Sequence, residues 1–393
     1  MIPTYRNSFN EAYSDAKYEE LLSNLTAKAG QRPAFRISES PIFMTFKFRE
    51  KLKDVAESII DQIISCPDSE LQKAIPSNCN VPNDTLKPHF LTIDFGICTD
   101  ENGELVPQLI ELQAFPTLYS FQKELQNSFC EVYPFLKELA PEITDEAYYQ
   151  KLRDLIVGDE NPENVVLLEL YPHKQKTNVD FYLTKKHIGI EIVCLSEVLK
   201  ERKNLFYEKD GRKIQIKRIY NRVIFDELDQ IPNFKTEFDF REEVNVKWIT
   251  HPNWFFKVSK FLLPKLQHQY IPKSYFLNEF PTEENLSDFV LKPLFSFAGS
   301  GVNLYPKQDE IDKIEDKENF IMQRKVNYAP LFKDPNNELS KAEIRILYIW
   351  NENEARPQLM QRLVRMTKAE MVNVDFNKKD AIWIGGSTVF FAK

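Results

Sequence analysis

The pattern of apolar and polar residues changes twice along the chain, near residue 158 and near residue 255. In the first region, two strand-like runs, 89–97 and 105–115, flank an Asn-Gly turn. This arrangement predicts a β-hairpin. Elsewhere in this region apolar residues recur at the spacing of an amphipathic helix. Helices are predicted over residues 49–65, 121–139 and 144–157.

The middle region, residues 159–255, contains short and continuous apolar runs. Residues 164–171 and 188–195 predict buried strands, because both faces of these runs are apolar. Residues 207–223 form two strand-like arms around an Asp-Gly turn. A helix is expected between the first two strands, although residues 173–186 are polar and ambiguous. Strands that alternate with helices are typical of a small Rossmann-like α/β domain with a parallel sheet.

The third region, residues 256–393, is rich in strands. Residues 257–277 predict a helix, a break and a strand. The fold class is therefore predicted to be α/β, in the α+β sense, with regions at 1–158, 159–255 and 256–393. Further strands are predicted at residues 320–326, 343–350, 359–366 and 383–391.

Composition excludes several classes of protein. The 393 residues are 42% hydrophobic and 28% charged, as in an ordinary globular protein. No apolar run reaches the ~20 residues that span a bilayer, and the first residues are too polar for a signal peptide. The net charge of -8 disfavours a nucleic-acid partner. Five scattered cysteines without a Cys-x-x-Cys pair disfavour disulfides and zinc. We expect a cytoplasmic protein with no membrane partner.

Glycine is scarce, and its distribution points to the C-terminal third. Of only 10 glycines, four lie in two places, at 299/301 and at 385/386. Residues 290–302, VLKPLFSFAGSGV, place Lys292 before a loop of small residues. Small residues let backbone N–H groups approach phosphate oxygens, to which a lysine adds charge. The loop matches neither the Walker A nor the Rossmann pattern, so a plain tight turn remains the alternative.

The hairpin carries candidate metal ligands. Glu111 and Gln113 project to the same face of the returning strand, because they are two residues apart. Asp94 on the paired strand can join them. Two carboxylates and an amide carbonyl are hard oxygen ligands that suit magnesium. The alternative is an ordinary hairpin with a solvated polar face. The apolar neighbours of Glu111 favour the metal site.

Taken together, these motifs resemble the ATP-grasp superfamily. An aspartate, a hairpin turn and then Glu-x-Gln on a strand look like the metal-binding end of such an enzyme. This element precedes the lysine and the glycine loop, an order that resembles the permuted branch containing eukaryotic-type glutathione synthetase and glutathionylspermidine synthase. Residues 363–368, LVRMTK, and 385–391, GGSTVFF, also look like the end of glutathione synthetase. The resemblance implies a circularly permuted ATP-grasp fold that uses ATP and Mg²⁺.

The resemblance also implies roles for particular residues. Lys257 or Lys260 would be the first nucleotide lysine, and Lys292 the second. The backbone of Gln323 and Val326, with Lys325 between them, would face the adenine. The loop over the phosphates would contain Ser296, Gly299, Ser300 and Gly301; Glu343 or Arg345 would face the phosphates; Arg365 and Lys368 would hold a substrate carboxylate or the transferred phosphate; Asp94, Glu111 and Gln113 would bind magnesium.

The activity implied is an ATP-dependent carboxylate–amine ligase that forms an acyl phosphate. The relatives imply a small-molecule acid and amine, such as an amino acid, a short peptide or a polyamine. A phosphotransferase on the same scaffold stays open as an alternative. A nucleotide-binding pseudoenzyme is a second alternative, because Gln113 replaces the usual asparagine and Ser296 stands near the usual loop glutamate. For Arg222, a surface salt bridge is favoured over a position in an interdomain cleft.

Overall fold

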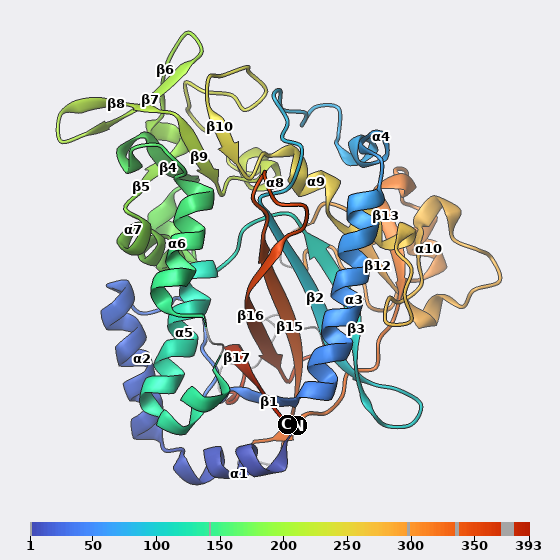
Figure 1. The fold of residues 1–393 in the computed structure, drawn as a ribbon. Coiled ribbons are helices and arrows are strands. Elements are labelled where there is room, and N and C mark those ends of the chain that lie inside the picture. The colour runs from blue at the N-terminus through green and yellow to red at the C-terminus, as the bar shows by residue number, and fades with distance from the viewer. Residues whose placement is uncertain (1, 141–142, 297–298, 335–337, 371–380) are drawn as a thin grey trace.

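The computed structural model describes residues 2–140, 143–296, 299–334, 338–370 and 381–393. Its centre is a sheet of seven described strands in the order β1-β17-β16-β15-β2-β3, with β14 paired to β15 (Figure 1). The N-terminal and C-terminal parts of the chain therefore share one sheet. The strands are β1 (Ile42–Thr45), β2 (Phe90–Thr99), β3 (Leu105–Gln113), β14 (Phe332–Lys333), β15 (Leu339–Ile349), β16 (Gln358–Thr367) and β17 (Gly385–Ala392).

The predicted hairpin is confirmed as β2 and β3, which pair antiparallel. The register sets Asp94 directly opposite Glu111 and then shifts, so that Phe95 lies opposite Leu109. Such a bulge bends the strand and redirects its side chains. β2 also pairs with β15, which places Asp94 opposite Arg345. Nine of the ten residues of β2 are buried, because the strand is covered on both faces.

Helices cover both faces of this sheet (Figure 1). Helix α3 (Phe46–Ser65) buries its predicted apolar stripe, and the Thr45 hydroxyl caps it by accepting from Phe48 N at 3.2 Å. Helix α5 (Tyr119–Val132) packs on β16 and β17. The remaining helices are α1 (Pro3–Ala12), α2 (Asp15–Ala29), α4 (Asp68–Leu71), α6 (Asp145–Ile156), α7 (Asn178–Ile188), α8 (Phe225–Asp229), α9 (Asn253–Lys257) and α10 (Gln308–Ile311).

The predicted parallel sheet of the middle region is also present. Its strands β4 (Val165–Glu169), β5 (Glu191–Cys194), β9 (Arg218–Asn221) and β10 (Lys247–Ile249) pair in parallel in the order β10-β9-β4-β5. The ambiguous segment contains α7, which ends at Gly189 in a left-handed conformation. The predicted Asp-Gly hairpin belongs to a projecting sheet of β6 (Leu199–Glu201), β7 (Asn204–Lys209) and β8 (Arg212–Ile216).

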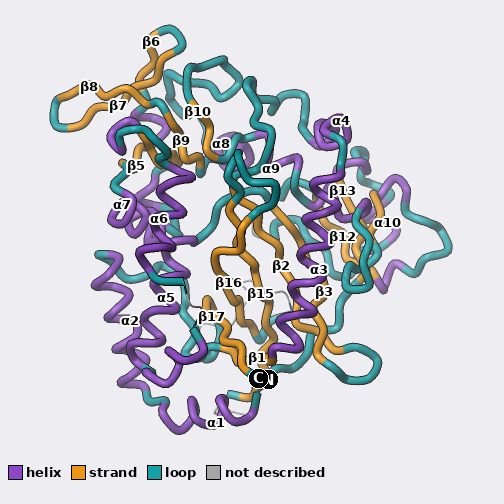
Figure 2. The backbone as a smooth tube through the Cα atoms, in the orientation of Figure 1, coloured by secondary structure: helices purple, strands orange, loops and turns teal. Residues whose placement is uncertain are grey.

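The remaining sheet, a small one in the order β11-β13-β12, lies beside β3 (Figure 2). Its strands are β11 (Ser274–Phe276), β12 (Phe289–Pro293) and β13 (Phe320–Arg324). The helix predicted at the start of 257–277 is wrong in extent. The chain there forms the end of α9 and a short 3-10 helix, Lys260–Lys265, that contains Pro264. Proline cannot donate the hydrogen bond that a continuing α-helix needs.

No helix among the described residues is long and apolar enough to cross a membrane.

The last strand, β17, lies inside the large sheet and depends on a close backbone approach. Gly385 has a φ of 110°, and a Cβ there would lie 2.3 Å from the carbonyl oxygen of Arg36. Gly386 N donates to the same oxygen at 2.9 Å. The glycine pair at 385/386 therefore joins the segment before β1 to the C-terminal strand.

We predict that Gly385→Ala lowers the free energy of unfolding by about 3 kcal/mol, because it adds left-handed strain to a backbone clash. Gly386→Ala is the matched control, since its Cβ would first meet a neighbour at 3.6 Å. The control should cost less than about 1 kcal/mol. Urea denaturation of both variants measures the difference, and equal losses would contradict this account of Gly385.

Candidate active site

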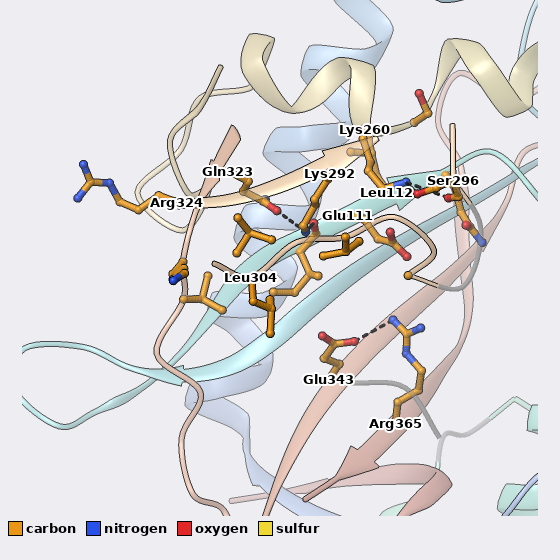
Figure 3. A pocket seen from close by; sticks show the side chains of 18 of the residues that line it. Glu111, Leu112, Lys260, Lys292, Ser296, Leu304, Gln323, Arg324, Glu343 and Arg365 are labelled. Carbon is orange, nitrogen blue, oxygen red and sulfur yellow. Dashed lines mark hydrogen bonds and ion pairs between the residues drawn. The ribbon is translucent and has the colours of Figure 1, made fainter. Parts of the chain in front are cut away.

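A cavity of about 570 Å³ lies between β3 of the large sheet and the small sheet of β12 and β13 (Figure 3). The loop after β12 and the ends of β15 and β16 complete its walls. It brings together residues that lie far apart in the sequence. The predicted site residues that line it are Glu111, Gln113, Lys260, Lys292, Ser296, Gly299, Gln323, Lys325, Val326, Arg345 and Arg365.

Two buried lysines face this cavity. Lys292 Nζ donates to the carbonyl of Ile110 at 3.3 Å and to Gln323 Oε1 at 2.5 Å. Lys260 Nζ donates to the carbonyls of Ser296 at 3.0 Å and of Leu294 at 3.4 Å. Within the described residues, all of these partners are uncharged. Burial lowers the pKa of Lys292 to about 8 and also lowers the pKa of Lys260. Buried cations without a counter-ion are costly unless a ligand supplies the negative charge.

Opposite the lysines, charged residues form a row across three neighbouring strands. Arg345 on β15 donates to both carboxylate oxygens of Asp94 on β2, each at 2.6 Å. Its Nη2 also lies 3.5 Å from Glu111 on β3. Burial raises the pKa of Asp94, but the Arg345 and Arg365 guanidinium groups outweigh it, so the pKa lies below its ordinary value. Asp94 therefore stays ionised and holds the guanidinium groups.

Arg365 on β16 joins the same network. Its Nη2 donates to Asp94 and, at 2.8 Å, to Glu343 on β15, the residue directly opposite it in the sheet. Burial raises the pKa of Glu343. Tyr328 donates its hydroxyl hydrogen to Glu343 as well.

Tyr328 was not identified from the sequence as a site residue, although Gly96 indicated that another residue packs closely against this strand. A Cβ at Gly96 would lie 2.9 Å from the Tyr328 ring, and a lone glycine inside a strand often marks such a close approach.

The structure places five predicted site residues outside the cavity, as far as the chain is described, and one of them is the buried Asp94. Lys257 pairs with Asp68 and Asp84, each at 2.7 Å, on the far side of α9. Lys368 pairs with Asp334 and Glu338. Ser300 and Gly301 do not line the cavity wall, and residues 297–298 of the same loop are outside the described residues. Of the two candidates for a first nucleotide lysine, the cavity contains Lys260.

Only some of the predicted metal ligands are available to bind a hard cation in the cavity. Glu111 and Gln113 line the cavity and offer a carboxylate and an amide oxygen. Asp94 does not fit this role, because both of its oxygens accept hydrogen bonds from arginines. No group of three or more His, Cys, Asp and Glu side chains in the described chain is arranged as a metal site. Glu111 and Gln113 are therefore the residues that could hold magnesium.

Arg222 is not at the surface, so the expected surface salt bridge is wrong. Its side chain is 7% exposed, and Nε and Nη1 have no hydrogen-bond partner among the described residues. The guanidinium lies over the rings of Phe115, at 4.9 Å, and Phe181, at 5.4 Å. It follows the end of β9, at the carboxyl edge of the parallel sheet, where ligands of open α/β sheets bind.

The surroundings of Arg222 connect this edge to the cavity. Glu169 ends the neighbouring strand β4, and burial raises its pKa to about 8 despite the nearby Arg222 charge. Phe115, beneath the guanidinium, packs edge-on against Phe255 at 5.9 Å. Phe255 in turn forms part of the cavity wall. One aromatic residue, Phe115, therefore separates the unpartnered arginine from the wall of the lysine cavity.

Comparisons with known proteins bear on the fold. No protein-family model matches the chain, and no curated protein matches it. Among solved structures, it is similar to a glutathione synthetase-like effector from Globodera pallida in its apo form, with a TM-score of 0.61 and 10% sequence identity. The match covers 97% of this chain and 99% of the other. The chain thus has a mixed α/β fold like that of the effector.

We predict that Asp94→Asn lowers the free energy of unfolding by about 3 kcal/mol, because it leaves two buried guanidinium groups without their shared carboxylate. Glu111→Gln is the matched control on the neighbouring strand, where the carboxylate is more exposed and only one distant contact is lost. It should cost less than about 1 kcal/mol. Chemical denaturation compares the two, and a neutral Asp94→Asn would show that Asp94 does not hold the arginines.

Proposed function

We propose that the protein is an ATP-dependent carboxylate–amine ligase built on a circularly permuted ATP-grasp fold. The observation that carries the proposal is the pair of buried lysines, Lys260 and Lys292, which face a cavity and have only uncharged partners among the described residues. A polyphosphate would supply the missing negative charge. The fold similarity to a glutathione synthetase-like effector supports the same reaction class by analogy.

The cavity wall offers distinct surfaces for the parts of a nucleotide. Gln323 lies on β13, Lys325 and Val326 follow the end of this strand, and all three line the cavity. Their backbone groups would bind the adenine edge. Lys260, Lys292 and the loop at Ser296 and Gly299 also line the cavity, and their ammonium groups and small residues suit phosphates. A magnesium ion held by Glu111 and Gln113 would neutralise charge on those phosphates.

The proposed chemistry needs no nucleophilic side chain. A carboxylate oxygen of the acid attacks the γ-phosphorus of ATP, the bond to ADP breaks, and an acyl phosphate forms. The amine then attacks the acyl carbon, and phosphate and a proton leave. Positioning and charge neutralisation do most of the work in phosphoryl transfer. Arg345 and Arg365, held in place by Asp94, are the cavity residues that would stabilise charge on the transferred group.

Arg222 would anchor the acid substrate. Its guanidinium is buried, lies at the carboxyl edge of the parallel sheet, and keeps two nitrogens without partners among the described residues. A carboxylate is the group that such a planar donor binds best. The aromatic contact through Phe115 and Phe255 places this anchor beside the nucleotide cavity. The acid would therefore extend from Arg222 toward the phosphates.

A second candidate function is nucleotide binding without turnover. It is favoured by one observation: the Asp94 carboxylate is fully engaged by Arg345 and Arg365, which leaves the cavity with a reduced set of metal ligands. Ligase turnover separates the two candidates, because a ligase releases ADP only when magnesium, an acid and an amine are all present. ATP binding without ADP release across a panel of amino acids, short peptides and polyamines would favour the second candidate.

We predict that Lys260→Met and Lys292→Met each weaken ATP binding by roughly tenfold or more, since each removes a charge-assisted contact to phosphate. Thermal stability should change little, because the removal of a buried cation without a counter-ion offsets the cost of the oxygen acceptors that each change leaves without this donor. Lys273→Met, an exposed lysine beside the small sheet, is the control and should bind ATP normally. Isothermal titration measures binding, and unchanged affinity in both cavity variants would overturn the proposed function.

We predict that Arg222→Met raises the KM for the acid by roughly tenfold or more while leaving ATP affinity unchanged, because it removes a bidentate anchor outside the nucleotide cavity. Methionine preserves much of the apolar contact with Phe115 and Phe181. The free energy of unfolding should stay the same or rise by up to about 2 kcal/mol, as is common when a functional buried charge is removed. A large loss of stability with unchanged KM would instead make Arg222 a structural residue.

A further inference from the structure

The side chain of Gln323 is hydrogen-bonded both within the small sheet and to β3 of the large sheet (Figure 3). It lies on β13, the central strand of the small sheet, and is 4% exposed. Its Oε1 accepts from Lys292 Nζ at 2.5 Å, and its Nε2 donates to the carbonyl of Leu109 on β3 at 3.3 Å. The amide thus connects the cavity lysine to the hairpin.

Only a side chain that accepts at one end and donates at the other satisfies both neighbours. The ammonium group of Lys292 can only donate, and the carbonyl of Leu109 can only accept. An ionised carboxylate in place of the amide would satisfy the lysine but would face the Leu109 carbonyl with a second acceptor. An apolar side chain would remove the amide donor to the Leu109 carbonyl and would leave Lys292 with the Ile110 carbonyl as its partner, at a cost in desolvation. The geometry therefore specifies a neutral amide at position 323.

We propose that Gln323 is a positioning residue that fixes the Lys292 ammonium group in the cavity and, because it is uncharged, leaves the full lysine charge available to a bound polyphosphate. This inference rests on the proposed function and adds to it a control of nucleotide affinity by pH. Lys292 has only two uncharged partners, Ile110 O and Gln323 Oε1, within the described chain. A carboxylate at 323 would neutralise the charge that the phosphates need.

The other charged groups around Lys292 set the direction of the pH dependence. Burial lowers the Lys292 pKa to about 8; Lys260 lowers it further, whereas Glu111 on β3, Glu343 on β15 and Asp94 on β2 raise it. Because burial lowers this pKa, Lys292 loses its proton at a lower pH than an exposed lysine does, and only the protonated form attracts phosphate. Affinity for ATP should fall as the pH rises from 7 to 9. Bound phosphate would favour the proton and so move the midpoint upward.

The test uses full-length protein with two substitutions at 323 and one control. Gln323→Glu places a charge beside Lys292, and Gln323→Met removes both hydrogen bonds without adding charge. Gln361→Glu is the matched control, a buried glutamine of β16 whose Nε2 donates to Gln126 Oε1 at 2.9 Å outside the cavity. The pKa of Lys292 is measured without nucleotide by NMR of labelled lysine side chains, with the signal assigned from Lys292→Met.

We predict that Gln323→Glu raises the Lys292 pKa by roughly one unit or more. It should also weaken ATP binding at pH 7 by roughly tenfold and remove the fall in affinity between pH 7 and 9. Gln323→Met should weaken binding by about threefold, because one fixed contact is lost, and should keep the pH dependence. Gln361→Glu should match the wild type in both measurements.

The role of Gln323 and the proposed function would be overturned by different results. If the wild type binds ATP and Gln323→Glu binds it equally well with an unshifted Lys292, the role of Gln323 is wrong while the proposed function stands. If neither the wild type nor Gln361→Glu binds ATP, the proposed function is wrong, and the role of Gln323 in nucleotide binding is overturned with it. Should Gln323→Glu fail to fold, a wild-type affinity that does not change between pH 7 and 9 would equally overturn the inference.

Discussion

The ammonium group of Lys292 joins two sheets that come from distant parts of the chain. It extends from β12 of the small sheet to the carbonyl of Ile110 on β3, 182 residues earlier in the sequence. The Gln323 amide makes the parallel connection to Leu109. Burial of these contacts lowers the pKa of Lys292, and neither of its hydrogen-bond partners within the described chain is charged, so neither offsets the charge of the protonated ammonium group. The cavity depends on this arrangement, and so do the anion binding and the pH dependence proposed for it.

A row of charged residues faces the lysines and serves a different purpose. Glu111, Asp94 and Arg345 lie directly opposite one another on three adjacent strands, and Arg365 joins from the fourth. A buried ion pair contributes little net stability, since desolvation offsets most of the attraction between its charges. Its effect here is geometric, because a guanidinium held by a carboxylate from behind cannot leave the cavity wall. Preorganised donors of this kind are what phosphoryl transfer requires.

The parallel sheet contributes the second half of the proposed site. Its carboxyl edge presents Arg222 and Glu169 at the ends of neighbouring strands, and the ring of Phe115 lies between this edge and the lysine cavity. The hairpin strand β3 therefore serves both halves, since Glu111 and Gln113 face the cavity and Phe115 follows two residues later under the arginine. In the proposed ligase, this shared strand would connect the anchor for the acid with the cavity for the nucleotide.

The sequence by itself determined the elements whose signals are local. The β2–β3 hairpin, the amphipathic α3 and the parallel sheet follow from residue periodicity and turn residues. The bulge that sets Asp94 opposite Glu111 does not follow from them, because a regular register would set Asp94 opposite Ile110. Only the tertiary structure decided which lysine enters the cavity, that Asp94 holds arginines, and that Arg222 is buried. These properties depend on partners that are tens to hundreds of residues away in the sequence. Periodicity reports which face of an element is buried, but it does not report what lies against that face.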